Sequence, residues 1–394
     1  MTTTINNEHK KLNVPNLRFK EFQGEWEKYT LEDVMNFSTT RINSSELNED
    51  NYVSTENMLQ DYQGIVDAKS VPEDVNVISF SCGDILISNI RPYLKKVWKA
   101  TYNGGCSSDV FVLKANDNIE SDYLHYVIAN DKFINFVMSG AKGVKMPRGD
   151  KNQMKTYSLS LPKIQEQKKI GKILSLLDER ITTQNKIIDK LRSLIKGICN
   201  NYFEKLSVQE KANLIRLSDV LKERNEYSSK DGKFIHGTLS KDGIFPKTGR
   251  WDRDFLVKQE DKKYKVTHLD DICYNPANLK FGVICRNTFG DLIFSPIYVT
   301  FEVCKNVNIG FMELYLTNHN FIEKVRRFEQ GTVYERMAVS PEDFLSYKIR
   351  IPSYPDQTFF YKKVQWLITL SQNEMKLLSQ YKKLRQYLLR QMFI

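Results

Sequence analysis

Leu31-Glu32-Asp33-Val34 returns as Leu217-Ser218-Asp219-Val220, at an offset of 186 positions. Offsets between 186 and 190 relate further matching segments along the whole chain. These matches are Asp84-Ile85 with Asp271-Ile272, Asn130 with Asn318, Phe133-Ile134 with Phe321-Ile322, Gly143 with Gly331, and Leu161-Pro162 with Ile351-Pro352. The chain therefore contains two copies of one unit, which indicates a protein that contacts two similar targets at a fixed separation.

A long helix is predicted after each copy. Beyond Pro162, leucine and isoleucine alternate by three and four residues, with Gln184 in one such position, which is a heptad pattern. Its seam positions include Leu174, Leu177, Ile181, Ile188, Leu191 and Ile195. Beyond Pro352 a broader apolar stripe includes Leu367, Leu378, Leu384 and Leu388. Ser371, Glu374 and Arg385 interrupt this second stripe where the register of the first helix predicts apolar residues.

Each apolar stripe needs a partner, because an apolar helix face left in water is unfavourable. The simplest solution is that the two helices pair with each other. Since a globular unit lies between them in the chain, antiparallel pairing is expected. The alternative is that each helix packs only on its own domain.

Short β-branched and aromatic runs separated by Gly, Asn, Asp and Pro precede each helix, and they predict a curved β structure. The predicted strand segments are 77–80, 84–87 and 110–113 in the first copy, and 271–274, 282–284 and 297–301 in the second. One helix is expected to close each unit, near residues 123–138 and 311–327. The fold class is therefore α+β: two similar domains separated by two long helices that pair as an antiparallel coiled coil.

The predicted domains are residues 1–162 and 206–352, and the predicted spacer helices are residues 163–205 and 353–394. With 394 residues, 41% of them hydrophobic, the chain is long enough for two cores. No apolar run approaches the length of a membrane span, and the polar start lacks the apolar core of a signal peptide. We therefore expect a cytoplasmic protein without a membrane partner.

The net charge of +10 is concentrated in the helical segments. Residues 164–205 hold nine basic and five acidic residues, and residues 357–394 hold seven basic and one acidic. The remaining residues are balanced, so a nucleic-acid surface on the globular domains must come from local clustering of cations.

Catalytic motifs are not apparent in the sequence. The six cysteines lack C-x-x-C spacing, and no histidine recurs at a matching position. Asn275-Pro276-Ala277-Asn278 resembles the Asn-Pro-Pro-aromatic loop of amino-methyltransferases, but it lacks the second proline and the aromatic residue. Neither a phosphate-binding loop nor a matched carboxylate cluster occurs. We predict no catalytic residues, no metal site and no cofactor.

Two pairs of basic and polar loops are candidates for DNA binding. One pair is residues 89–96 with residues 276–283, and the other is residues 140–151 with residues 331–337. Arginine and asparagine can form bidentate contacts with guanine and adenine, and lysine neutralises phosphate. The candidate residues are Arg91, Lys95, Lys142, Lys145, Arg148, Asn278, Lys280, Tyr334 and Arg336. The alternative for each of them is a solvated surface loop.

A series of short motifs runs along the chain: Val14-Pro15-Asn16-Leu17-Arg18-Phe19, then Trp26, Leu31 and Val34, then Leu161-Pro162 before Gln165-Glu166-Gln167. In these motifs the chain resembles the specificity (S) subunits of Type I restriction-modification enzymes. In the second copy, Tyr354-Pro355-Asp356-Gln357 keeps the glutamine but has proline and aspartate in place of the residues before it. After the opening motif at Val14, the chain has a domain, a proline and a helix, and then a domain, a proline and a helix again. This order carries the resemblance over essentially the full chain.

The resemblance implies two target-recognition domains, each reading one half of a bipartite site in double-stranded DNA. It also implies that the helix pair sets the spacer and docks two methyltransferase (M) subunits, and that restriction (R) subunits cleave. The chain itself would then be no enzyme. The rival hypotheses are a self-sufficient DNA methyltransferase or nuclease with diverged motifs, and a coiled-coil adaptor without a DNA role.

Overall fold

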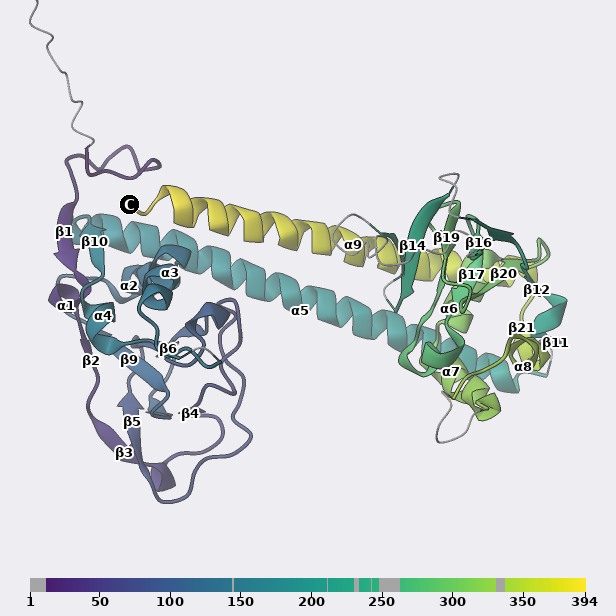
Figure 1. The fold of residues 1–394 in the computed structure, drawn as a ribbon, viewed down its shortest axis with the longest axis horizontal. Coiled ribbons are helices and arrows are strands. Elements are labelled where there is room, and N and C mark those ends of the chain that lie inside the picture. The colour runs from purple at the N-terminus through teal and green to yellow at the C-terminus, as the bar shows by residue number, and fades with distance from the viewer. Residues whose placement is uncertain are drawn as a thin grey trace, which may run out of the picture. The chain divides into compact units, whose positions relative to one another are not determined.

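The structure, a computed structural model, describes residues 12–143, 145–210, 212–229, 234–241, 243–247, 263–330 and 337–394. The chain forms two compact units. The first unit comprises residues 1–185 and 376–394, and the second comprises residues 186–375. Each unit therefore contains one β-rich domain together with part of both long helices (Figure 1).

The β-rich domain of the first unit contains two four-stranded sheets. One has the order β2 (Met35–Phe37), β9 (Val110–Ala115), β6 (Ile85–Ser88), β7 (Val97–Lys99), and all its pairings are antiparallel. The other has the order β3 (Arg41–Asn43), β5 (Asn76–Phe80), β8 (Gly104–Cys106), β4 (Tyr52–Val53). All residues of β6 are buried, which explains its continuous apolar run at the centre of the first sheet.

The second unit repeats the first of these sheets. Its order is β12 (Leu221–Glu223), β20 (Val299–Val303), β17 (Ile272–Tyr274), β18 (Ile284–Arg286), again antiparallel. The other sheet differs, with the five-stranded order β13 (Tyr227–Ser228), β16 (Tyr264–Thr267), β19 (Leu292–Phe294), β14 (Ile235–Ser240), β15 (Gly243–Pro246). The repeat therefore preserves the sheet whose strands are connected by the candidate loops of residues 89–96 and 276–283.

A two-stranded antiparallel ribbon leads into each long helix. In the first unit β1 (Glu27–Thr30) pairs with β10 (Ser158–Leu161), and in the second β11 (Asn213–Arg216) pairs with β21 (Lys348–Ile351). Three short α-helices are α1 (Leu31–Val34), α4 (Lys151–Lys155) and α8 (Pro341–Ser346). The described 3-10 helices are η1 (Ser44–Glu46), η2 (Pro92–Leu94), η3 (Leu217–Asp219), η6 (Pro276–Phe281) and η7 (Arg326–Phe328).

The prediction of a single closing helix in each domain is wrong. The first domain has α2 (Ser121–Ile128) and α3 (Asp131–Ser139), and the second has α6 (Ile309–Leu316) and α7 (His319–Val325). Asn130 and Asn318 cause the breaks, because both have extended backbones and their side chains accept a hydrogen bond from the backbone two residues later. Each asparagine is thus the N-cap of a new helix.

The two long helices are α5 (Ile164–Val208) and α9 (Tyr354–Gln391). In the first unit the beginning of α5 lies beside the end of α9 (Figure 1), and the two share a core. There Phe393 stacks on Tyr123 at a centroid distance of 5.1 Å. In the second unit the end of α5 lies beside the beginning of α9, and Tyr202 stacks on Phe360 at 3.7 Å. The antiparallel pairing is confirmed, and the alternative that each helix packs only on its own domain is wrong.

The heptad positions of α5 lie on the paired face. Leu174, Leu177 and Ile188 are buried, and Ile181, Leu191 and Ile195 are half-buried, as are Leu367, Leu378 and Leu388 of α9. The polar interruptions continue the same register, since Gln184 and Ser371 are buried and Arg385 is half-buried. Leu384, by contrast, is exposed beside Arg385. Polar residues therefore occupy part of the seam.

Among the described residues, no helix is long and apolar enough to cross a membrane. The six cysteines are all free thiols.

Candidate nucleic-acid interface

In the first unit the tertiary structure joins two of the loops that the sequence singled out. Arg91 N donates to Pro147 O at 2.8 Å, and Gly149 N donates to Asn89 O at 2.9 Å. Lys142 and Arg148 exchange backbone hydrogen bonds of 3.1 and 2.9 Å, which closes the second loop into a hairpin. Two segments about fifty residues apart in sequence thus form one surface, which we call the first basic surface (residues 89–96 and 140–150).

Four of the candidate cations on the first basic surface are exposed: Arg91, Lys142, Lys145 and Arg148. Lys142 Nζ lies 3.3 Å from Asp150, and an Arg148 guanidinium nitrogen lies 3.5 Å from Asp109. Exposed ion pairs of this kind contribute little to stability, about 0–1 kcal/mol, so they can be exchanged for contacts with an anionic ligand. This surface is suited to binding phosphate.

Lys95 has a different setting from the other candidates. Its ammonium group lies 2.8 Å from Asp131 and above the ring of Tyr62, 6.0 Å from the centroid. Tyr62 in turn donates its backbone N–H to Lys95 O at 3.0 Å. Lys95 therefore connects its loop to neighbouring elements, whereas the other four cations extend into solvent.

Backbone strain is concentrated around the loop between β6 and β7. Six described non-glycine residues have positive φ, and four of them lie here: Asp61, Tyr62, Arg91 and Lys95. Such a conformation costs roughly 1–3 kcal/mol per residue and persists only where the surroundings impose it. Here the hydrogen bonds of Asp61 N to Leu94 O and of Arg91 N to Pro147 O impose it. The loop is therefore held in one shape.

Burial and the neighbouring Arg91 both lower the pKa of Lys96. Lys96 Nζ donates to Thr55 O, so this lysine is held beneath the exposed cations of the loop. Lys96 was not among the candidate residues predicted from the sequence. Its position after Lys95 in a run of basic residues was the signal that could have indicated it.

In the second unit, hydrogen bonds join residues that flank the corresponding loops, in the same topological position. Val339 N donates to Pro276 O at 3.4 Å, and Tyr274 Oη donates to Val339 O at 3.1 Å. Gln330 and Ala338 exchange backbone hydrogen bonds of 2.9 and 3.0 Å, as Lys142 and Arg148 do in the first unit.

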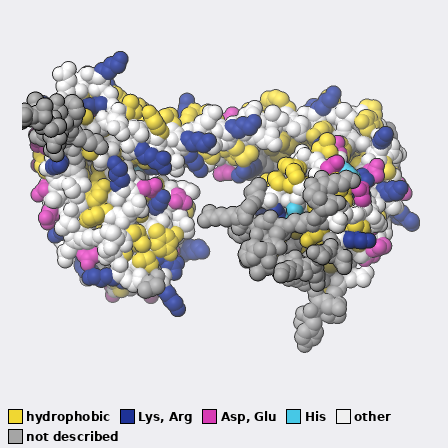
Figure 2. Space-filling view, turned by 45° about the horizontal axis from the view of Figure 1, so that its top comes forward, with side chains coloured by type: hydrophobic (Ala, Val, Ile, Leu, Met, Phe, Trp, Pro, Cys, Tyr) yellow, Lys and Arg dark blue, Asp and Glu magenta, His cyan; other side chains and the backbone are white. Residues whose placement is uncertain are grey.

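Of the second-unit candidates, Lys280 is exposed and Asn278 is half-buried within η6. Tyr334 and Arg336 lie outside the described residues. In the space-filling view, Lys and Arg side chains are distributed along the long helices and over the domains (Figure 2).

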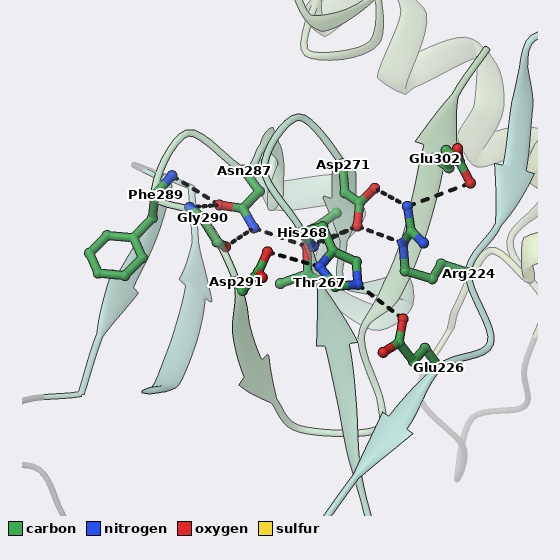
Figure 3. A network of polar contacts seen from close by, with 11 residues as sticks. Arg224, Glu226, Thr267, His268, Asp271, Asn287, Phe289, Gly290, Asp291 and Glu302 are labelled. Carbon is green, nitrogen blue, oxygen red and sulfur yellow. Dashed lines mark hydrogen bonds and ion pairs between the residues drawn. The ribbon is translucent and has the colours of Figure 1, made fainter. Parts of the chain in front are cut away.

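A polar network braces the sheets of the second domain (Figure 3). Arg224 donates to both carboxylate oxygens of Asp271, at 2.9 and 3.1 Å, and its guanidinium also lies 3.5 Å from Glu302. Asn287 donates to Thr267 and closes the turn after β18 by accepting from Phe289 N and Gly290 N. The network joins strands of both sheets, and the sequence offered no signal for it because its members are far apart in the chain.

His268 bridges two carboxylates at the edge of this network. Its ring nitrogens lie 2.8 Å from Asp291 and 3.0 Å from Glu226 (Figure 3). Burial acts to lower the pKa of His268, but the hydrogen bonds to Glu226 and Asp291 outweigh it, so the net pKa is raised. Protonation of this histidine therefore strengthens the brace.

The described residues contain no group of three or more His, Cys, Asp and Glu side chains that could hold a metal ion. The polar residues of the network satisfy one another within the protein, whereas Arg91, Lys142, Lys145 and Arg148 are exposed on the first basic surface. The charge and exposure of the first basic surface are therefore suited to an anionic ligand.

The known proteins that are similar to this chain all point to one family. Residues 23–193 match the family described as the Type I restriction modification DNA specificity domain. The chain is 36% identical over 103 residues to the specificity subunit of the type I restriction enzyme MjaVIII from Methanocaldococcus jannaschii, covering 26% of this chain and 24% of that protein. It is 24% identical over 126 residues to the EcoDI specificity subunit of Escherichia coli, covering 32% and 28%.

A solved structure supports the fold along nearly the whole chain. The S subunit of a Type I restriction-modification system from M. genitalium has a TM-score of 0.64, with 16% identity, and the match covers 97% of this chain and 99% of that one. The fold is therefore that of the restriction-modification specificity subunits. The match of residues 23–193 to the Type I DNA specificity domain family confirms the resemblance to these subunits. The matched segments span about a quarter to a third of the length of the curated relatives.

Proposed function

We propose that this chain is the DNA-recognition subunit of a Type I restriction-modification complex. In this proposal the domains of residues 1–162 and 206–352 each read one half of a bipartite site, and the helices of residues 163–205 and 353–394 set the spacer. The observation that carries it is the first basic surface, where two loops joined by backbone hydrogen bonds expose four cations. In the second unit Val339, which follows the equivalent loop, bonds to Pro276 at the start of the other loop.

The chemistry of the first basic surface divides into two roles. Lys142 and Lys145 are point charges on an exposed hairpin, which suits contact with phosphate. Arg91 and Arg148 present planar guanidinium groups that can bind the O6 and N7 atoms of guanine together. In the second domain Asn278, Lys280, Tyr334 and Arg336 are the proposed counterparts, and Lys95 contributes by holding its loop in place.

The helices offer a surface for two methyltransferase subunits, one in each unit. In the second unit Phe359 and Trp366 are exposed seven residues apart on α9, and Trp366 is 67% exposed. Ile187 and Leu194 of α5 are exposed with the same spacing. In the first unit Ile173 and Leu176 of α5 and Tyr387 of α9 are exposed. Exposed apolar residues at helical spacing are typical of helix docking surfaces.

In this assembly the chain is not an enzyme and binds no cofactor of its own. The M subunits would methylate and the R subunits would cleave. Incubating the purified chain with DNA and a labelled methyl donor tests this point: transfer is expected only after M subunits are added. Transfer by the chain alone would favour the rival hypothesis of a self-sufficient methyltransferase.

DNA binding of the assembled complex tests the recognition role. The variant Lys142→Ala, Lys145→Ala, Arg148→Ala should weaken binding and reduce the slope of log affinity against log salt by about 1 for each phosphate that is no longer neutralised. The matched control, Lys20→Ala, Lys28→Ala, Lys69→Ala, removes three exposed lysines outside the loops and should have a much smaller effect. Equal behaviour of the two variants would contradict the assigned surface, and absence of any sequence-specific binding would favour the adaptor hypothesis.

A further inference from the structure

An exposed aromatic side chain lies in the corresponding loop of each recognition domain. Tyr93, in η2 between β6 and β7, is 48% exposed. Phe281, in η6 between β17 and β18, is 66% exposed. The surrounding loop sequences differ, yet each loop presents a large ring within two residues of the left-handed residue that ends its 3-10 helix.

Both aromatic residues are displayed on rigid supports. Next to Tyr93, Pro92 is buried, and the flanking Arg91 and Lys95 are fixed in left-handed conformations. Beside Phe281, Leu279 is fully buried, and Gly282, with φ of +77°, ends the helix by donating to Asn278 O and Leu279 O. A ring on such a support loses little conformational entropy on binding, because its backbone is already ordered.

Cations accompany both rings. Arg91 is exposed two residues before Tyr93, within the first basic surface. Lys280 Nζ lies 5.2 Å from the centroid of the Phe281 ring. Exposed aromatic rings interleaved with cations match a ligand that has an anionic backbone and flat faces on which a ring can stack. Duplex DNA, the ligand of the proposed function, has both features.

We infer that Tyr93 and Phe281 are wedges that insert at a base step in each half-site and unstack it. This inference rests on the proposed function. An aromatic ring can stack on any base, so two domains that read different sequences can both use this kind of contact. Apolar wedges of this kind kink the duplex and allow more of the protein surface to reach it. The wedge is the contact that both domains share and that tolerates any base sequence. The loop cations, which differ between the domains, supply the contacts that depend on the base sequence.

The test uses the complex assembled with M subunits and duplexes containing 2-aminopurine, a base whose fluorescence rises when it is unstacked. The half-sites are first mapped from the positions methylated in cells. The probe is then placed in turn at each position in and beside them except the methylated ones, because a methyltransferase flips the base that it modifies. The wild-type complex should raise the fluorescence at one step in each half-site. Tyr93→Ala should abolish the rise in the first half-site alone, and Phe281→Ala should abolish it in the second alone.

Each alanine variant should also weaken binding about 5- to 100-fold, the range that loss of one base-aromatic stack produces. Tyr93→Phe keeps the ring and should keep both the fluorescence rise and the affinity. Phe245→Ala removes a similarly exposed ring on β15, outside these loops, and should leave both signals unchanged. Circular dichroism melting of each variant shows that the fold is intact.

The outcomes separate the wedge from the proposed function. Specific binding by the wild-type complex without a fluorescence rise in either half-site would overturn the wedge and leave the recognition role standing. A fluorescence rise that persists in the Tyr93→Ala and Phe281→Ala variants would also overturn the wedge and leave the recognition role standing. A complex that binds no DNA would overturn both.

Discussion

Gln167 and Gln357 make the same pair of hydrogen bonds in the two halves of the chain. Gln167 Nε2 donates to Pro162 O at 2.9 Å, and its Oε1 accepts from Glu120 N at 2.8 Å. Gln357 Nε2 donates to Pro352 O at 3.0 Å, and its Oε1 accepts from Asn308 N at 2.9 Å. Both side chains are 1% exposed. Each glutamine thus joins the proline turn before a long helix to the start of a domain helix.

This geometry explains why the glutamine recurs while the residue before it changes. Glu166 pairs with Arg18 from the N-terminal segment, with two hydrogen bonds of 2.8 Å. Its counterpart Asp356 instead accepts from Ser353 in the first turn of α9. The glutamine serves a contact that both halves share, and the acidic residue serves a contact specific to each half.

Gln167→Ala should destabilise the protein by about 1–3 kcal/mol, because it leaves a buried backbone donor and acceptor unsatisfied. Gln357→Ala should cost a similar amount. Urea unfolding measures both effects. Gln165→Ala is the matched control: that side chain is more exposed on the same helical turn, and its loss should change stability by less than about 0.5 kcal/mol. Equal effects of Gln165→Ala and Gln167→Ala would contradict this account.

Arg385→Met should destabilise the helix pair in the first unit. Arg385 Nε donates to Asp178 Oδ1 at 2.6 Å, and Tyr126 Oη donates to Asp178 Oδ2 at 2.9 Å. Removing the guanidinium leaves a partly buried carboxylate without its counterion, which should cost about 1–3 kcal/mol after allowance for partial exposure. Chemical denaturation measures this loss.

The double variant Asp178→Asn, Arg385→Met should recover much of that stability. The asparagine is neutral and still accepts from Tyr126, so the uncompensated charge disappears. Lys383→Met, on the exposed side of α9, should have little effect. A double variant no more stable than Arg385→Met would show that the ion pair does not explain the loss.

His268 should make the second domain less stable as the pH rises. Because its folded pKa is raised, the folded state binds the proton more tightly than the unfolded chain does. Its contribution is therefore fully present below the ordinary histidine pKa of about 6.5 and is lost as the pH rises through the higher folded value. The melting temperature of His268→Gln should fall furthest below wild type near pH 5.5, and the two proteins should converge towards pH 8.5. A difference that grew with pH would contradict the assigned sign.

Thiol reactivity should separate the cysteines in the native protein. Cys82 is exposed, whereas burial raises the pKa of Cys106 and Cys285 to about 12 and of Cys199 to about 11. Because the thiolate is the reactive form, a chromogenic disulfide reagent at pH 8 should modify Cys82 rapidly and the other three slowly. Cys82→Ser should remove the rapid phase, and all six thiols of the wild-type protein should react in denaturant. Rapid modification of Cys106 would contradict the packing of its domain.

Much of the fold was predictable from local patterns. The β-branched runs predicted β6 and β17, and the alternation of leucine and isoleucine predicted the seam of α5 from Leu174 onward. These patterns depend on periodicity, which a linear sequence displays directly. The breaks at Asn130 and Asn318 were missed, because asparagine caps compete with a helical pattern that continues on both sides.

The candidate site was only partly predictable. Composition indicated both basic loops, but nothing in the sequence showed that Arg91 N would bond to Pro147 O. Lys95 looks like its neighbours in the sequence, whereas the structure pairs it with Asp131. The bracing of Arg224 by Asp271 and the shared display of Tyr93 and Phe281 likewise depend on contacts between distant segments.

The sequence by itself determined the duplication, the α+β class and the presence of two long helices with apolar stripes, because each of these is a repeating pattern of side-chain type along the chain. Tertiary structure alone decided which cations are free to meet a ligand, because the partner of a side chain is set by packing between segments that the chain brings together only on folding. Arg385 illustrates the difference. In the sequence it interrupts an apolar stripe, and in the folded protein it pairs with Asp178 across the seam.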